Sequence, residues 1–200
     1  ENQIAMTKAG IEGEVNLCDY LSTLIKYDDK LEGLIAFASL AYKLEDNDKD
    51  YIPDTDTLLV YGKHILILDA KNLKCKPGQE FTLIDGCIID EKGKEVIEVH
   101  PSTHIWQKVM ENADIEIESI DGYVCIVNNT EIGIIRNDEW YESHTKLIHI
   151  QELKAILEEW VANKENTLYL NMLTEVAKSQ IKREKDISFD INAIKRKFSI

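Results

Sequence analysis

The chain lacks the long apolar run that a membrane-spanning helix needs. No apolar stretch approaches the roughly 20 residues required, and no basic segment followed by an apolar one opens the sequence. We therefore expect a cytoplasmic protein that does not enter a membrane. The first residue is Glu1 rather than Met, which indicates either an excised domain or a trimmed chain, so we expect other parts of a larger protein to be missing.

Cysteine is scarce, and its spacing excludes the common zinc and redox sites. No two cysteines form a CxxC pair, so a zinc knuckle or a redox pair is excluded and we expect free, buried or semi-buried thiols. His100 and His104 are four residues apart, but Pro101 and Ser102 between them predict a helix start. Without a third ligand, the two histidines do not make a metal site. The cysteines are Cys18, Cys75, Cys87 and Cys125.

Several motifs are also missing, and basic residues are outnumbered by acidic ones. The sequence has no GxGxxG, GxxxxGK[ST], HExxH or GxSxG pattern, which excludes the usual dinucleotide, P-loop, zincin and serine-hydrolase sites. It has 23 basic and 37 acidic residues, a net charge of −14, which disfavours binding nucleic acid over a broad surface. Residues 161–200 nevertheless carry +3, leaving −17 for the rest. This basic end is either a phosphate contact or a solvated helix face.

What the chain does have is a strong hairpin pattern within Pro53–Lys76. The apolar runs Leu58–Val60 and Ile65–Leu68 flank Gly62 and Lys63. Short apolar runs around a tight turn predict a β-hairpin. We take this hairpin as the element around which the fold is organised.

Charged residues lie at the open end of the predicted hairpin. Asp56 is near the start of the first strand, and Asp69 and Lys71 are at the end of the second. Strand side chains alternate with a period of two, so Asp69 and Lys71 should share a face, as should Asp54 and Asp56. Charges beside apolar strands are costly unless they pair or hold a metal. The pattern therefore predicts a functional site.

A long helix is predicted before the hairpin, over Thr7–Ile25. Gly10 and Gly13 each weaken a helix by roughly 1 kcal/mol relative to Ala, which indicates a reason such as close backbone approach. Glu14 lies beside the predicted apolar face. That face consists of Ile11, Val15, Cys18, Leu21 and Ile25, at intervals of three and four residues.

The remaining pattern predicts an α/β or α+β fold with a central mixed sheet flanked by helices. We expect one domain over residues 1–161 and a helical extension over 162–200, either packed on it or linking to a missing region. Further strands are predicted over 34–42, where a short helix is the alternative, and over 81–89, 95–99, 123–127, 132–135 and 147–150. Helices are predicted over 102–113, 150–161 and 168–185.

Together these residues resemble a known family. Gly10–Glu14 on the first helix, Asp56 followed thirteen residues later by Asp69–Asn72, and Gln107 on a later helix are similar to the nuclease-related domain, NERD. That family belongs to the PD-(D/E)xK superfamily of restriction-endonuclease-like nucleases, which includes archaeal Holliday-junction resolvases. The resemblance covers about residues 8–127 and implies a restriction-endonuclease-like core.

The chain departs from the family pattern at three places. The family more often has Glu at the position of Asp69 and His at the position of Thr57. The stretch before and within the later helix is usually richer in Arg, whereas here it offers only Lys108. These departures concern nucleic-acid binding more than metal binding.

The resemblance implies a role for each site residue. Asp56 and Asp69 would ligate Mg²⁺, for which Mn²⁺ can substitute, with the backbone carbonyl of Ala70 as a further candidate ligand. Glu14 would complete or organise the metal shell, and Asp54 is a rival or auxiliary ligand. Lys71 would orient the attacking water or stabilise the phosphate. Gln107 would fix a water or a backbone contact. Mg²⁺ prefers a few carboxylate oxygens and keeps several waters, which agrees with this arrangement.

The expected function is hydrolysis of DNA phosphodiester bonds by a metal-activated water. Lys74 and Lys76, just after the hairpin, are candidate phosphate contacts, and RNA stays open as a substrate. The alternative is a non-catalytic module of a larger protein that binds nucleic acid, a nucleotide or a protein on a nuclease-like fold. A homo-oligomer also stays open.

Overall fold

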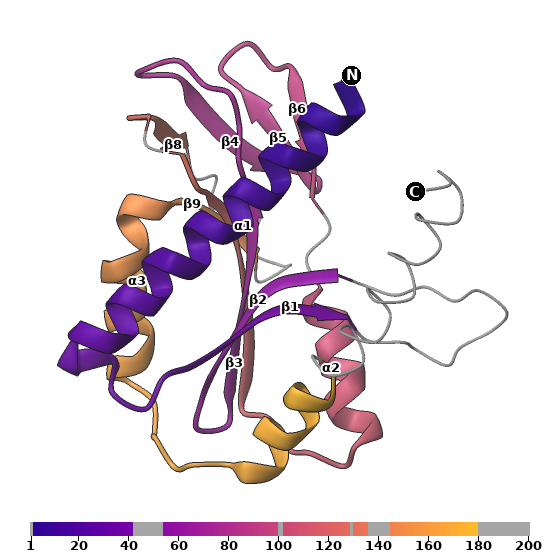
Figure 1. Ribbon diagram of the computed structural model, residues 1–200, viewed down its shortest axis with the longest axis vertical. Coiled ribbons are helices and arrows are strands. Elements are labelled where there is room, and N and C mark those ends of the chain that lie inside the picture. The colour runs from indigo at the N-terminus through magenta and orange to yellow at the C-terminus, as the bar shows by residue number, and fades with distance from the viewer. Residues whose placement is uncertain (1, 42–53, 100–101, 129, 136–144, 180–200) are drawn as a thin grey trace, which may run out of the picture.

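The computed structural model describes residues 2–41, 54–99, 102–128, 130–135 and 145–179. Its centre is a five-stranded sheet in the order β1-β2-β3-β7-β9 (Figure 1). The first three strands are antiparallel, and β7 and β9 run parallel to β3. The strands are β1 (Ile35–Ala41), β2 (Asp54–Tyr61), β3 (His64–Lys71), β7 (Ser119–Ile126) and β9 (Thr145–His149).

Helices cover both faces of this sheet. On one side, here called the α1 face, lie α1 (Asn2–Tyr27), the short turns η1 (Asp29–Leu31) and η3 (Ile150–Glu152), and α3 (Leu153–Ala162). On the other, the α2 face, lie α2 (Thr103–Asn112) and the helical residues 170–179. The expected mixed sheet flanked by helices is therefore confirmed.

Strand alternation explains why both faces need cover. Ile65 and Leu66 are neighbours in β3 and both are fully buried, yet they belong to different apolar clusters. Leu66 packs with Leu17 on the α1 face, whereas Ile65 packs with Trp106 on the α2 face. Burying one such side chain contributes about 1.5–3 kcal/mol, so a sheet apolar on both sides is stable only between two layers.

A smaller mixed sheet, in the order β6-β5-β4-β8, packs on the upper part of the central sheet in Figure 1. Phe81 and Ile88 of this sheet pack with Val124 and Leu147 of the central one. Its strands are β4 (Glu80–Ile84), β5 (Cys87–Asp90), β6 (Glu95–Glu98) and β8 (Gly133–Ile135). The single strand predicted over 81–89 is wrong, because Asp85 and Gly86 both adopt positive φ and form a turn within it.

The hairpin prediction is confirmed. β2 and β3 are antiparallel, and Tyr61 pairs with His64 across the turn at Gly62 and Lys63. Gly62 has a φ of +58°, and a Cβ there would collide with the carbonyl oxygen of Glu165. Only glycine therefore fits this turn without strain.

Most other predicted elements are present with shifted ends. The strands predicted over 34–42, 123–127, 132–135 and 147–150 correspond to β1, β7, β8 and β9, and the helix over 102–113 is α2. The helix predicted over 168–185 is seen at 170–179, and its last residues lie outside the described part of the chain. Met172 and Val176 of this helix pack into the α2-face cluster.

The predicted buried face of α1 is wrong at its N-terminal end. Ile11 is 57% exposed and Val15 is 51% exposed. The helix buries Leu17, which is not part of that predicted face, together with Leu21, which is. Cys18 and Ile25 of the predicted face are half-buried. Both stripes have helical spacing, so the sequence does not distinguish them, and the exposed one is left without a covering element among the described residues.

The two glycines of α1 give a matched pair of substitutions. A Cβ on Gly13 would lie 3.0 Å from Cβ of Asn72 and 3.1 Å from Cγ2 of Val127, whereas nothing lies within 4 Å of one on Gly10. We expect Gly10→Ala to raise the free energy of unfolding by about 0.5–1 kcal/mol. Gly13→Ala should lower it by about 1 kcal/mol, because Asn72 is held by a hydrogen bond and yields little. Urea unfolding measures both, and equal stabilisation would contradict the close packing.

The four cysteines are free thiols, as expected, and Cys125 is fully buried. None of the described helices combines the length and apolar character that crossing a bilayer requires.

Candidate functional site

Asp56 lies where the ladder between β2 and β3 ends. The last pair is Thr57 with Leu68. One residue further, the backbone N–H of Ala70 donates to Oδ2 of Asp56 at 2.7 Å. The carboxylate thus takes the place of a backbone acceptor, which fixes its position at the mouth of the hairpin.

β1, the strand that pairs with the other side of β2, has a strained backbone next to Asp56. Ala38 pairs with Thr57 and Leu40 with Thr55, and Ser39 between them has a φ of +56°. This conformation costs a residue with a side chain about 1–2 kcal/mol. Such strain is typical of functional sites, where surrounding structure enforces it. Nothing in the sequence pattern predicts it.

A buried polar network holds the start of β2 against α2. Nε1 of Trp106 donates to Oγ1 of Thr55 at 2.9 Å, and Oγ1 of Thr55 is 3.0 Å from Oγ of Ser102. Thr55 and Ser102 are both buried. Satisfied buried networks rigidify their surroundings, so the residue that precedes Asp56 is firmly placed.

Asp69 and Lys71 meet as the alternation of β3 predicts. Nζ of Lys71 donates to Oδ1 of Asp69 at 2.5 Å, and their side chains are 21% and 18% exposed. They pair in register with Val124 and Ile126 of β7. The charged pair therefore lies at the end of β3, beside fully buried apolar residues of β7.

The negative charge of Asp69 acts on Asp56. Burial, and then the negative charge of Asp69, raise the pKa of Asp56 to about 7. The charge of Glu14 adds to this rise in pKa, and the hydrogen bond from Ala70 opposes it. Near neutral pH, ionising the carboxyl group of Asp56 beside the charges of Asp69 and Glu14 therefore costs free energy. A cation beside Asp56 and Asp69 would relieve that repulsion.

Glu14 reaches the site from α1. Its side chain is half-buried, and its charge acts on both Asp56 and Cys18. Two contacts hold α1 beside the end of β3. Gly13 packs on Asn72, and Nδ2 of Asn72 donates to the carbonyl oxygen of Ala9 at 3.0 Å. Asn72 is thus a positioning residue, and no pattern in the sequence identifies it as one.

Gln107 is not brought to the carboxylates. Its Nε2 donates to Oε1 of Glu111 on the same helix at 2.8 Å. Within the described residues no hydrogen bond joins Gln107 to Asp56, Asp69 or Lys71. Trp106, its neighbour, is the α2 residue that reaches β2.

The remaining predicted residues are less informative. Lys74 and Lys76 are exposed just beyond β3, as phosphate contacts must be. His104 is exposed on α2. The side chain of Asp54 and the whole of His100 lie outside what the structure describes.

The acidic residues of the site fit Mg²⁺ only if the ion is held by few protein ligands. Across the described residues, no three His, Cys, Asp or Glu side chains are grouped as a ready-made metal shell. Mg²⁺, however, is commonly held by one or two carboxylates and completes its shell with water and substrate oxygens. Asp56 and Asp69 supply such a pair, and their mutual repulsion favours a divalent cation.

Comparison of the chain with protein-family models, curated proteins and solved structures finds no match.

Proposed function

We propose that the protein is a metal-dependent nuclease of the NERD and PD-(D/E)xK type that hydrolyses DNA. The observation that carries the proposal is the meeting of Asp56, Asp69 and Lys71 at the mouth of the hairpin. The order of elements, a helix followed by the hairpin within a mixed sheet, supports a restriction-endonuclease-like core.

Each residue has a chemical role in this proposal. Asp56 and Asp69 hold the metal, and Glu14 adds negative charge from α1. When bound, Mg²⁺ lowers the pKa of a water and neutralises phosphate charge. Lys71 directs its ammonium group at the same place, where it stabilises the charge that gathers on the phosphate oxygens as the P–O ester bond breaks. Ala70 keeps Asp56 oriented through its N–H.

The test is cleavage of plasmid and linear DNA in Mg²⁺ or Mn²⁺. Asp69→Asn removes a ligand with little change of shape, and we expect cleavage to fall by a factor of roughly 100 or more. Asp19→Asn, an exposed acid on α1, is the matched control and should cleave like the parent protein. Equal cleavage by all three proteins would indicate a contaminating nuclease and end the catalytic proposal.

A non-catalytic binding module is the second candidate. It is favoured by the lack of a three-ligand group among the described residues and by the ion pair that already occupies Asp69. Calorimetric titration with Mn²⁺ separates the two. Binding that depends on Asp56 and Asp69 supports the nuclease, and absence of binding supports the module.

A further inference from the structure

A second group of reactive side chains lies at the opposite end of β3 from Asp69. His64 is the first residue of β3, and it pairs in register with Ser119, the first residue of β7. Because the two strands are parallel, side chains that pair in register stand on the same face of the sheet. Nδ1 of His64 accordingly lies 2.9 Å from Oγ of Ser119. The register of the sheet therefore builds a serine–histidine pair.

An acid lies on the other side of the histidine. Nε2 of His64 is 3.4 Å from Oε2 of Glu118, and the backbone N–H of Glu118 donates to the carbonyl oxygen of Lys63 at 2.9 Å, which fixes the backbone there. A neutral imidazole that donates from Nε2 to the carboxylate keeps a lone pair on Nδ1. Nδ1 can then accept the proton of the Ser119 hydroxyl, as the base in a nucleophile–base–acid triad does.

The surroundings keep His64 in the uncharged form that a base needs. Its side chain is buried. Burial, and then the positive charge of Lys164, lower the pKa of His64 below its ordinary value of 6.5, whereas the charges of Glu118 and Asp121 act to raise it. Near neutral pH the imidazole is therefore uncharged and able to take a proton.

A pocket of about 660 Å³ opens beside the pair, between α3 and the strands β7 and β9. Two residues that line it contact the pair. Oδ2 of Asp121 lies 3.5 Å from Oγ of Ser119, and the Trp160 ring packs edge-on to the His64 ring with 6.4 Å between their centres. The less polar part of the lining consists of Tyr123, Ile148 and Ile156. A pocket with apolar lining and a few polar groups is typical of a site for a small molecule.

Lys164 brings a positive charge to the same place. It lines the pocket, its Nζ lies 4.7 Å from the centre of the Trp160 ring, and its charge acts on His64. When a nucleophile attacks an ester, the carbonyl oxygen gains negative charge, and a cation near that oxygen lowers the barrier. Lys164 can supply this stabilisation.

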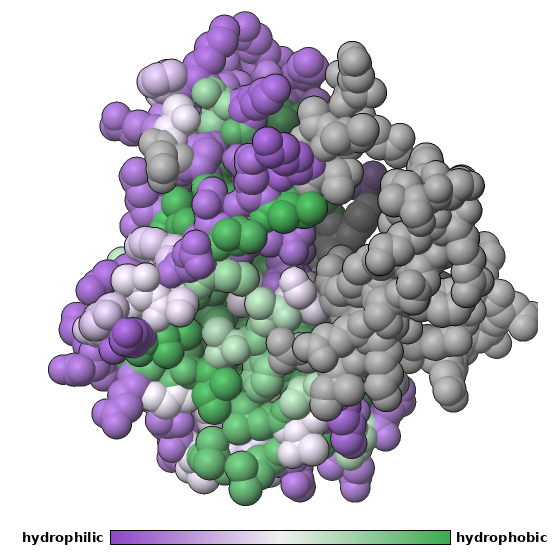
Figure 2. All heavy atoms as spheres, viewed as in Figure 1, coloured by the Kyte–Doolittle hydropathy of each residue, from purple (hydrophilic) through white to green (hydrophobic). Residues whose placement is uncertain are grey.

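The segment after α3 gives this end of the hairpin an apolar surface. It runs across the hairpin turn, where the carbonyl oxygen of Glu165 lies against Gly62. Leu168 and Leu170 of this segment are more than half exposed. Figure 2 shows hydrophobic side chains in the lower part of the molecule, where the hairpin turn lies in Figure 1. Exposed apolar surface of this kind suits a ligand that carries an apolar group.

We propose that Ser119, His64 and Glu118 form a second catalytic site, which hydrolyses carboxylic esters with a short apolar acyl group. Oγ of Ser119 attacks the carbonyl carbon of the ester, and Nδ1 of His64 takes the hydroxyl proton. The ester C–O bond breaks, His64 gives that proton to the leaving alkoxide, and the acyl group stays on Oγ. Water then attacks the acyl carbon, and its proton passes through His64 to Oγ as the carboxylic acid leaves. This inference does not depend on the proposed nuclease activity, because the two sites lie at opposite ends of β3.

Labelling of the full chain with a fluorophosphonate in EDTA tests the nucleophile directly. The reagent forms a P–O bond with an activated serine hydroxyl and expels fluoride, and it needs no metal. Peptide mapping should find the label on Ser119, and Ser119→Ala should lose it by a factor of roughly 100 or more. Absence of label from Ser119 in the parent chain, or equal labelling of Ser119→Ala, would overturn the proposal.

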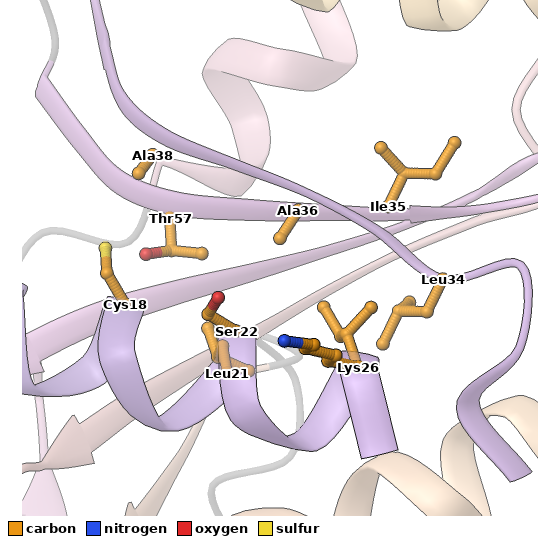
Figure 3. A pocket seen from close by; sticks show the side chains of 10 residues that line it. Cys18, Leu21, Ser22, Lys26, Leu34, Ile35, Ala36, Ala38 and Thr57 are labelled. Carbon is orange, nitrogen blue, oxygen red and sulfur yellow. The ribbon is translucent and has the colours of Figure 1, made fainter. Parts of the chain in front are cut away.

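Ser22→Ala is the matched control for this labelling. Ser22 is an exposed serine of α1 that lines another cavity, of about 460 Å³, between α1 and β1 (Figure 3). None of the described residues that line that cavity is a histidine. Ser22→Ala should therefore be labelled like the parent chain, and a loss equal to that in Ser119→Ala would also contradict the proposal.

Glu118→Gln provides a second readout that leaves the core intact, since the Glu118 side chain is 53% exposed. Hydrolysis of p-nitrophenyl acetate should fall as the pH drops through the pKa of His64. Gln removes a charge that raises this pKa, so the midpoint should move to lower pH and the maximal rate should fall about tenfold. Glu116→Gln, at another exposed acid, should change neither. An unchanged midpoint and rate in Glu118→Gln would overturn the role of Glu118 and the triad with it.

Discussion

Replacing Lys71 by Met should abolish DNA cleavage while leaving divalent-cation binding intact. Lys71 is the one cation in contact with Asp69 in the described structure, at 2.5 Å. In the proposed mechanism the ammonium group of Lys71, whose side chain is half-buried, stabilises phosphate charge. Removal of one such electrostatic group typically costs a factor of about 100 to 1,000 in rate. We expect a loss of that size in single-turnover cleavage.

The matched control for this substitution lies at the other end of the same hairpin. Lys63 forms an ion pair with Glu116 at 2.8 Å, within the turn that joins β2 and β3. Lys63→Met removes an equivalent charge and should change cleavage by less than twofold, because an exposed pair of this kind contributes little. Full activity in Lys71→Met, or equal losses in both variants, would refute the role given to Lys71.

The second large effect concerns stability. In metal-free protein, Asp56→Asn should be more stable than the parent chain at pH 8. Burial and the charge of Asp69 raise the pKa of Asp56 to about 7, so ionising it costs free energy in the folded state. Asn keeps an oxygen that accepts the hydrogen bond from Ala70, and it carries no charge. The substitution therefore removes the cost and keeps the contact.

The pH dependence fixes the sign of this effect. The pKa of the Asp56 carboxyl is 3.8 in the unfolded chain and about 7 in the folded one. Stability from this group is therefore fully present below pH 3.8 and is lost as the pH rises towards 7. A tenfold difference in proton affinity between the two states corresponds to about 1.4 kcal/mol. Because solvent still reaches part of the carboxyl, we expect a gain of about 2 kcal/mol for Asp56→Asn at pH 8 and almost none at pH 4.

Chemical unfolding in EDTA at pH 4, 6 and 8 measures this gain. Asp19→Asn, on the exposed side of α1, should differ from the parent chain by less than about 0.5 kcal/mol at each pH. Addition of Mg²⁺ at pH 8 should stabilise the parent chain and not Asp56→Asn. A variant that is less stable than the parent chain at pH 8 would show that Asp56 is a structural residue, not a strained site residue.

The sequence predicts the contacts within the hairpin better than those around it. The contact between Asp69 and Lys71 follows from strand periodicity, and the turn at Gly62 and Lys63 sets which residues of β2 face those of β3. The hydrogen bond from Ala70 to Asp56 could not be predicted, because it depends on where the ladder stops. Nor could the positive φ of Ser39.

The errors have a common physical cause. Periodicity gives the spacing of apolar residues along a helix, but it does not say which neighbouring element covers them. It therefore predicts that Ile11 and Val15 are buried, whereas Leu17 is the residue that packs in the core. Gln107 has a position on α2 that its spacing predicts, yet its amide binds Glu111. The turn at Asp85 has a recognisable Asp-Gly signal, which the prediction of one strand over 81–89 neglects.

The most direct test of the proposed metal site is a crystal structure of the full chain grown with Mn²⁺, with anomalous scattering used to locate the metal. We predict a manganese peak in contact with the carboxylates of both Asp56 and Asp69, and its disappearance in Asp69→Asn. A structure in which manganese binds elsewhere, or in which Lys71 still pairs with Asp69 and no metal lies beside Asp56, would contradict the proposal.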